Sequence, residues 1–481
     1  MRLIGLLMAL ILTLTAPAMA KAPPPVTAKT IEALVRRHAE LEMFSGTVLV
    51  AKHDEVIYSG AFGDANKDHR IANRLETAYN IGSIGKTFTA VAIMQLVEAG
   101  KLKLDDKLGQ HLADFPFAEK DRITIQQLLN HSAGLGNYME HPEYPNRMAR
   151  IESIADILPL IYEQKPLFAP GERFEYSNSG MVVLGAIIEK LSGLSYPDYL
   201  RRHIFEPAGM RDTRLAQEHE VLPNRAIGYL PSEQGYVANL RMIMPASADG
   251  GLRTTAPDLL KFDQALTRGS LLKSEIQQQM YTPVGPAPHY ASGWETKALP
   301  GHRVVGHGGG APGVNAEFRR YLDDGYTLIV LSNYEMGASP LAESIERLLL
   351  GQPYRLPTAA DADLGRAQQL AATGAAKAAL PILERLGDAE PPHLPALYQL
   401  ARLRIVEKLG VEKALPALTR YIELADDAIQ PSKAAAWWRK GNAYELLGER
   451  SKARTCYETA LAQDPNLVEA QKALAALDGA N

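Results

Sequence analysis

The sequence predicts an α+β domain built on one antiparallel sheet, followed by an all-helical C-terminal domain. Strand-like segments lie near both ends of residues 28–353, and helix-like segments fill the interval between them. The strands must therefore meet from distant parts of the chain, with helices flanking the sheet and forming a further all-helical part. After about residue 358, Ala, Leu, Glu, Arg and Lys dominate, and helix-length segments alternate with short breaks. We therefore expect a helical domain over residues 354–481.

Residues 1–20 have the pattern of a secretion signal. Arg2 supplies the positive charge, Leu3–Leu14 is an apolar segment too short to span a bilayer comfortably, and Ala18-Met19-Ala20 resembles a cleavage site. Cleavage would leave residues 21–27 as a short Pro-rich leader, whereas an uncleaved N-terminal anchor is the alternative.

The cysteine content limits the cellular compartments that suit the protein, and the net charge limits the classes of partner that it can attract. Cys456 is the only cysteine, so the chain has no internal disulfide and no cysteine for a lipid anchor behind the signal. An exported protein without disulfides fits the bacterial periplasm or secretion. The net charge of −4 becomes −5 once Arg2 is removed. We expect no nucleic-acid binding and no stable membrane anchor after cleavage, because a mildly acidic chain has no general attraction for either surface.

The first domain begins with a helix and a hairpin. Thr30–Leu41 has amphipathic helical spacing, and the strands Gly46–Ala51 and Val56–Gly60 flank a polar turn. Strand character returns near the end of the domain, where a turn at residues 323–325 joins the last two strands. The later strands are predicted over His302–Gly306, Asn315–Leu322 and Tyr326–Ser332.

The stretch Ser83-Ile84-Gly85-Lys86 carries the first chemical signal. A serine and a lysine three residues apart at the head of a helix share one face. The helix continues over Thr87–Ala99, is apolar almost all round and stops before Gly100, so we expect it to be buried. A nucleophile there gains from the positive helix end, and the lysine can take its proton. Alone the motif is weak, because Ser270–Lys273 has the same spacing and an N-cap serine is the simple alternative.

Tyr176-Ser177-Asn178 is the second signal, ahead of a helix predicted over Met181–Leu191. In extended backbone, residues two apart point the same way, so the phenol of Tyr176 and the amide of Asn178 can share a pocket. Lowering a tyrosine pKa from about 10 to about 7 requires roughly 4 kcal/mol, much of which a nearby lysine ammonium can supply. A turn tyrosine packed on its own loop is the alternative.

A third signal is Gly306-His307-Gly308-Gly309-Gly310, on or just past a predicted strand. Glycines in a strand indicate a close approach to the backbone, as by a ligand that pairs with the strand edge beside an oxyanion-binding N–H. A flexible turn is the alternative. The His-Gly-Gly-Gly loop of lipases would need a Gly-x-Ser-x-Gly elbow, and Ile81 stands two places before Ser83 instead. No His-Glu-x-x-His motif or Cys/His cluster is present, so we expect no metal.

The C-terminal domain resembles tetratricopeptide repeats, in which small residues let two antiparallel helices approach and aromatic residues fill the gap. The clearest copy comprises Trp437, Gly441, Tyr444, Gly448, Ala453, Tyr457, Ala460 and Pro465. A looser copy comprises Leu400, Ala401, Gly410, Ala414 and Tyr421, and residues 374–386 form a fragment of a third. Such arrays bind peptides or helices, so we expect either a protein or peptide partner or a role in capping the first domain. A plain helical bundle is the alternative.

Taken together and in this order, the three signals of the first domain resemble the serine β-lactamase and penicillin-binding-protein superfamily. The nearest look-alikes are class C β-lactamases and the related esterases, D-aminopeptidases and D,D-peptidases. The resemblance covers about 28–353 and extends to Leu128–Leu135, Asp249–Leu259 and Ser292-Gly293-Trp294. It implies a β-lactamase-like fold and a serine hydrolase that acts through an acyl-enzyme, without a metal or organic cofactor.

The resemblance also implies a role for each residue. Ser83 is the expected nucleophile, and Lys86 orients it and shares its proton. Tyr176 is the expected general base and then acid, although the sequence leaves open whether Lys86 is the base. Asn178 is expected to hold the substrate carbonyl. The strand Gly308-Gly309-Gly310 would bind substrate, with the N–H groups of Ser83 and Gly310 forming the oxyanion hole.

One position departs from the family pattern. Class C β-lactamases have Lys-Thr-Gly at the third motif, where this chain has His307-Gly308-Gly309 and the histidine would take the place of the cation. A histidine near its reference pKa of about 6.5 is mostly neutral at pH 7. We therefore expect weak β-lactamase activity and favour esters or peptides that contain D-amino acids, such as those of peptidoglycan. A catalytically silent recognition domain with the repeats as a scaffold for protein partners is the alternative.

Overall fold

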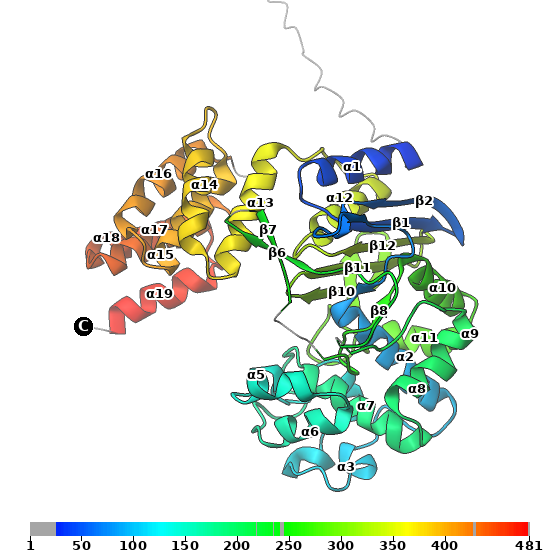
Figure 1. Cartoon of the computed structure of the whole chain (residues 1–481). Coiled ribbons are helices and arrows are strands. Elements are labelled where there is room, and N and C mark those ends of the chain that lie inside the picture. The colour runs from blue at the N-terminus through cyan, green and yellow to red at the C-terminus, as the bar shows by residue number, and fades with distance from the viewer. Residues whose placement is uncertain (1–25, 218, 234, 241–244, 427–429, 480–481) are drawn as a thin grey trace, which may run out of the picture.

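The computed structural model describes residues 26–217, 219–233, 235–240, 245–426 and 430–479 (Figure 1). The predicted signal at residues 1–20 lies outside these residues, as does most of the predicted leader. In the part of the chain that is described, no helix is long and apolar enough to cross a membrane.

A six-stranded antiparallel sheet forms the centre of the first domain, in the order β2-β1-β12-β11-β10-β9. Strand β1 pairs with β12 from Gly46 opposite Ser332 to Lys52 opposite Tyr326, so the sheet joins the start and the end of the domain as predicted. The strands are β1 (Gly46–Lys52), β2 (Glu55–Phe62), β9 (Glu295–Leu299), β10 (His302–Ala311), β11 (Val314–Tyr321) and β12 (Tyr326–Ser332).

Helices cover both faces of the sheet, which explains why strands β1 and β12 are mostly apolar on both sides. Val48 and Val50 pack in one core with α1 (Ala28–Glu40) and α12 (Ser339–Leu349). The alternate residues of β1, including Leu49, belong to a larger core on the opposite face. The helices there are α2 (Gly85–Glu98), α10 (Ala256–Thr267) and α11 (Ser274–Tyr281).

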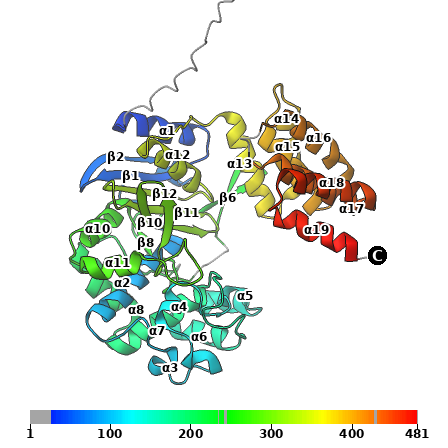
Figure 2. The same ribbon diagram turned by 180° about the vertical axis from the view of Figure 1, so that it is seen from behind.

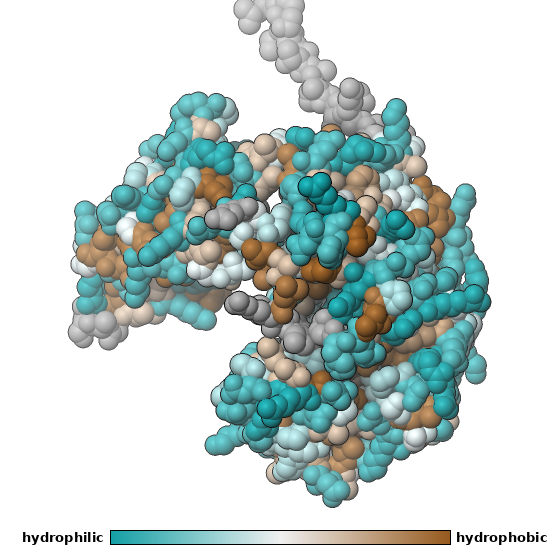
Figure 3. Space-filling model, viewed as in Figure 1, coloured by the Kyte–Doolittle hydropathy of each residue, from teal (hydrophilic) through white to brown (hydrophobic). Residues whose placement is uncertain are grey.

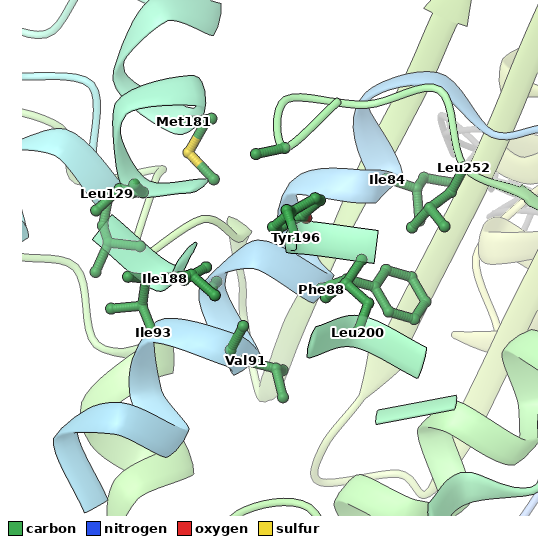
Figure 4. Packing of buried hydrophobic residues seen from close by; sticks show 14 of the residues in the cluster. Ile84, Phe88, Val91, Ile93, Leu129, Met181, Ile188, Tyr196, Leu200 and Leu252 are labelled. Carbon is green, nitrogen blue, oxygen red and sulfur yellow. The ribbon is translucent and has the colours of Figure 1, made fainter. Parts of the chain in front are cut away.

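Helix α2 occupies the middle of the larger core. Ser83 lies in the 3₁₀ turn Gly82–Ile84 that leads directly into α2, and Gly100, at φ +68°, follows its last residues. Apolar side chains surround the helix, as the sequence predicts. Figure 4 shows Ile84, Phe88, Val91 and Ile93 packed among Leu129, Met181, Ile188, Tyr196, Leu200 and Leu252.

Most of the remaining α-helices of this domain gather below the sheet in Figure 1 and form the helical part expected from the sequence. The remaining α-helices are α3 (Leu108–His111), α4 (Ile125–Leu129), α5 (Tyr144–Arg147), α6 (Ile154–Tyr162), α7 (Asn178–Ser192), α8 (Tyr196–Leu200) and α9 (Glu206–Ala208). Short two-stranded ribbons complete the domain: β3 (Asp64–Asn66) with β4 (Ile71–Ala72), β5 (Tyr79–Asn80) with β8 (Arg253–Thr254), and β6 (Tyr229–Ser232) with β7 (Gly235–Ala238).

Two expected element boundaries are wrong, and one strand was missed. Strand β10 does not end at Gly306 but runs to Ala311, so the whole glycine run is strand. Helix α7 begins at Asn178 rather than Met181. Strand β9 was not predicted, and residues 292–294 form a bend just ahead of it.

The C-terminal helices pack as successive antiparallel pairs beside the first domain (Figure 2). They are α13 (Ala359–Ala372), α14 (Ala376–Asp388), α15 (Leu394–Val406), α16 (Ala414–Leu424), α17 (Lys433–Leu446), α18 (Arg450–Gln463) and α19 (Val468–Gly479). A Cβ at Gly441 would lie 2.3 Å from the Tyr457 ring, which explains the small residue at that place in the repeat. The third fragment, predicted over residues 374–386, corresponds to α14, which packs against α13.

The two domains meet beside the β6–β7 hairpin. The Arg366 guanidinium of α13 donates hydrogen bonds to the carbonyls of Ser232 and Glu233, each at 2.9 Å. A cavity of about 610 Å³ lies between α13 and α15 on one side and this hairpin with residues 41–43 on the other. Figure 3 shows the surface hollowed between the domains.

Candidate active site

The Ser83 hydroxyl lies at the head of α2, held next to an amine. Ser83 is half-buried, and its Oγ accepts a hydrogen bond of 2.9 Å from Nζ of Lys86. Three residues of helical backbone therefore bring the hydroxyl and the amine together as the sequence predicts.

Lys86 is fully buried, and its amine is held from several sides. Besides Ser83, its Nζ donates to the carbonyl of Asp249 at 2.5 Å. The same Nζ lies 4.9 Å from the centroid of the Tyr176 ring. A lysine that is buried and bound by two oxygen atoms is fixed in place, so it can serve both the hydroxyl and the phenol.

Tyr176 projects from the extended segment that precedes α7. Its side chain is exposed, and among the described residues its hydroxyl makes no hydrogen bond. The ring packs 4.4 Å from the imidazole of His131 and 6.3 Å from that of His307, measured between ring centroids. The phenol thus stands at the open side of the Ser83–Lys86 pair, free to contact a substrate.

The glycine run of β10 passes directly against the turn that carries Ser83. A Cβ at Gly309 would lie 1.9 Å from the carbonyl oxygen of Ile81, and a Cβ at Gly82 would lie 2.8 Å from the Gly310 nitrogen. Only glycine allows two backbones to approach this closely. A Cβ at Gly310, in contrast, would meet nothing within 4 Å. Gly309 therefore serves the close packing, whereas Gly310 faces open space beside Ser83.

His307 is buried in β10 with both ring nitrogens engaged. Its Nδ1 lies 2.6 Å from the carbonyl oxygen of Gly308, which can only accept, so Nδ1 carries the proton. Its Nε2, 2.9 Å from the hydroxyl of Tyr290, then accepts a hydrogen bond. Burial, followed by the nearby Lys86 ammonium, lowers the pKa of His307 to about 3. His307 is therefore neutral at pH 7 and adds no positive charge to the site.

Asn178 is the first residue of α7, two residues after Tyr176. Its Nδ2 lies 3.4 Å from Oδ1 of Asn137 and 3.4 Å from Sδ of Met139. It is half-buried, at the border between the segment 137–139 and the Tyr176 segment. The structure therefore brings Ser83, Lys86, Tyr176 and the β10 glycines together. Asn178 lies next to this group, beside residues 137–139.

A cavity of about 320 Å³ lies beside the end of β10. The turn between β10 and β11, with Ala311 and Gly313, forms one wall, and residues 225–228 form another. Asn80, whose Oδ1 accepts from the N–H of Gly82 next to Ser83, also lines it. Ser83, Lys86, Tyr176 and the glycines at 308–310 do not line this cavity, so it lies past the end of the glycine run and not at the Ser83 hydroxyl.

Comparison with known proteins shows the family to which the chain belongs. The Beta-lactamase family matches residues 28–351. The chain belongs to the β-lactamase family. A tetratricopeptide repeat matches residues 434–467, within the C-terminal helices. A penicillin-binding protein of Bacillus subtilis (strain 168) is 33% identical over 355 residues, which cover 68% of this chain and 77% of that protein.

Solved structures of penicillin-binding proteins and related hydrolases are also similar to this chain. The penicillin binding protein from Bacillus halodurans has a TM-score of 0.61 and 32% identity, covering 66% of this chain and 98% of that one. A D-stereospecific amidohydrolase from Streptomyces sp. has a TM-score of 0.58 and 27% identity, covering 68% of this chain and 100% of that one. Relatives with this fold are serine hydrolases, and the present chain is an enzyme of that type.

Several site residues of this β-lactamase family member were not predicted as such. Tyr290 lies two residues before the recognised stretch Ser292-Gly293-Trp294, but it received no role. Asp249 supplies a carbonyl to Lys86, and burial raises the pKa of its own carboxyl, which accepts from the Tyr138 hydroxyl at 3.1 Å. His131 stood in a recognised stretch but received no role. Contact between His131 and Tyr176 depends on tertiary folding, which the sequence pattern does not show.

Proposed function

We propose that the enzyme cleaves esters or amides through an acyl-enzyme on Ser83, with substrates built from D-amino acids as the preferred class. The observation that carries this proposal is the Lys86 amine, which bonds to the Ser83 hydroxyl while lying 4.9 Å from the Tyr176 ring. A hydroxyl, an amine and a phenol at one open site are the groups that nucleophilic catalysis requires.

In the acylation step, the Ser83 oxygen attacks the substrate carbonyl and its proton passes to the Lys86–Tyr176 pair. The tetrahedral oxyanion forms against the backbone N–H groups of Ser83 and Gly310, which the Gly82–Gly309 contact keeps close to each other. The Tyr176 hydroxyl then protonates the leaving group. Water enters by the reverse sequence of proton transfers and releases the acid, which restores Ser83.

The substrate preference rests on charge and on the relatives. His307 is neutral, so the third motif offers no cation for the carboxylate of a β-lactam. We therefore expect weak β-lactamase activity at most. A relative described as a D-stereospecific amidohydrolase supports amides of D-amino acids. Export through the predicted signal would place the enzyme near peptidoglycan, a source of such peptides, and the repeats would bind a protein or peptide partner.

The test is a substrate panel with wild-type enzyme and Ser83→Ala. We expect turnover of p-nitrophenyl esters, faster cleavage of D-alanine p-nitroanilide than of its L-enantiomer, and slow cleavage of nitrocefin. Ser83→Ala should abolish all three without changing the melting temperature. Full activity in Ser83→Ala would remove Ser83 from the mechanism. Preference for the L-substrate would overturn the substrate class, and no turnover of any kind would favour the silent recognition domain.

A further inference from the structure

We propose that His131 is a positioning residue that holds the Tyr176 phenol over the Ser83–Lys86 pair. This inference rests on the proposed function, because it concerns the proton transfer assigned to Tyr176. His131 lies at the end of α4, far from Tyr176 in the sequence, and none of the catalytic steps above uses it.

The first observation is that His131 binds the backbone on both sides of Tyr176. Its carbonyl oxygen accepts the N–H of Glu175 at 2.9 Å. Its side-chain Nδ1 accepts the N–H of Ser177 at 3.3 Å. One residue thus fixes the peptide groups before and after Tyr176, which sets the direction of the side chain between them.

The second observation is contact with the phenol ring itself. The imidazole of His131 lies 4.4 Å from the Tyr176 ring and 4.6 Å from the Tyr290 ring, between centroids. Because the Tyr176 side chain is otherwise exposed, this contact limits rotation of the ring, whose centroid lies 4.9 Å from Nζ of Lys86. Tyr290 in turn bonds to His307, so the support behind the phenol is itself fixed.

The third observation is that His131 is unfavourable for stability. Its φ of +59° lies in the left-handed region, where glycine or asparagine fits with less strain. It is 2% exposed, and its Nε2 makes no hydrogen bond to any described residue. A strained backbone and a buried unpaired N–H at one position next to a reacting group point to a functional requirement.

The charge state of His131 fits this role. Burial, then the Lys86 ammonium and His307, hold the pKa of His131 well below its usual value, so the ring is neutral. The groups that face it are Lys86 from α2, His307 from β10, and the phenols of Tyr176 and Tyr290. A protonated ring would lose the Ser177 hydrogen bond and place a second cation beside Lys86.

The test compares His131→Asn with His131→Leu in the full-length protein. Asparagine keeps an acceptor at the place of Nδ1 and tolerates a positive φ, whereas leucine fills space but accepts no hydrogen bond. With p-nitrophenyl butyrate we expect kcat to fall roughly 100-fold in His131→Leu and about 10-fold in His131→Asn, with KM within about twofold of wild type. His38→Leu is the matched control, because His38 is also 2% exposed but lies in α1. It should lower the melting temperature without changing kcat.

A double-mutant cycle with Tyr176→Phe separates positioning from general damage. If His131 acts through Tyr176, adding Tyr176→Phe to His131→Leu should reduce kcat by less than threefold further, whereas Tyr176→Phe alone should cost far more. Additive effects, or wild-type kcat in either His131 variant, would overturn the proposal. If His131→Leu does not fold, the same double-mutant cycle is measured with His131→Asn in place of His131→Leu, and the same outcomes support or overturn the proposal. These outcomes are distinct from failure of the proposed function, which would appear as an inactive wild type.

Discussion

The glycine at position 309 provides a sharp test of the geometry at the oxyanion strand. In Gly309→Ala the new methyl would lie 1.9 Å from the Ile81 carbonyl oxygen and 2.8 Å from its carbon. Because ordinary contacts begin near 3.5 Å, strand β10 would have to retreat from the Ser83 turn by about 1.5 Å. That shift would carry the N–H of Gly310 out of hydrogen-bonding range of an oxyanion formed at Ser83.

Loss of one oxyanion donor typically costs about 100- to 1000-fold in kcat, or about 2.7–4 kcal/mol in transition-state stabilisation. We expect a fall of that size for Gly309→Ala in steady-state hydrolysis of p-nitrophenyl butyrate. Gly365→Ala is the control, since it lies in α13 outside the site and its methyl would meet nothing within 4 Å. It should keep kcat within about threefold of wild type. Equal kcat values for the two variants, both folded by circular dichroism, would refute the assignment of Gly310 to the oxyanion hole.

Two further predictions concern stability. The folded-state pKa of His307, lowered to about 3 mainly by burial, lies below its unfolded value, so the stabilising effect is complete above about pH 6.5 and is lost as the pH falls toward 3. His307→Gln should therefore show a smaller drop in melting temperature between pH 7 and pH 4.5 than wild type, and parallel curves would contradict this. Deleting residues 359–481 should leave the first domain folded and active, because the buried cluster of α13–α17 shares no residue with the clusters around the sheet. Aggregation of the truncated enzyme would show that the domains depend on each other.

The sequence predicts most of the fold where the signal is local. Helix α2 could be predicted because its apolar residues surround the whole helix, and strands β1, β2 and β12 because their apolar runs are flanked by turn residues. The extension of β10 through its glycines could not be predicted, because glycine by itself disfavours strands. Its conformation there depends on pairing with β11 and on contact with the Ser83 turn.

In the candidate site, too, the residues fixed by local spacing could be predicted, whereas those fixed by tertiary contacts could not. Ser83 and Lys86 could be placed together because helical spacing alone fixes them. Tyr176 and the glycine run required the family resemblance, since nothing local brings a loop and a strand to the head of α2. The partners of His307 depend on tertiary folding, because Tyr290 reaches it from the loop ahead of residues 292–294. The sequence suggested a mostly neutral histidine from its reference pKa, whereas the structure attributes the neutral state to burial.

The most direct measurement is the intact mass of the enzyme after incubation with a fluorophosphonate, followed by peptide mapping. If Ser83 is activated by Lys86, wild type should gain one adduct on the peptide that contains Ser83, and Lys86→Met should gain it at least about 100-fold more slowly. An adduct on another residue, or equal rates in the two proteins, would contradict the claim that the amine and the hydroxyl at the head of α2 act as one catalytic unit.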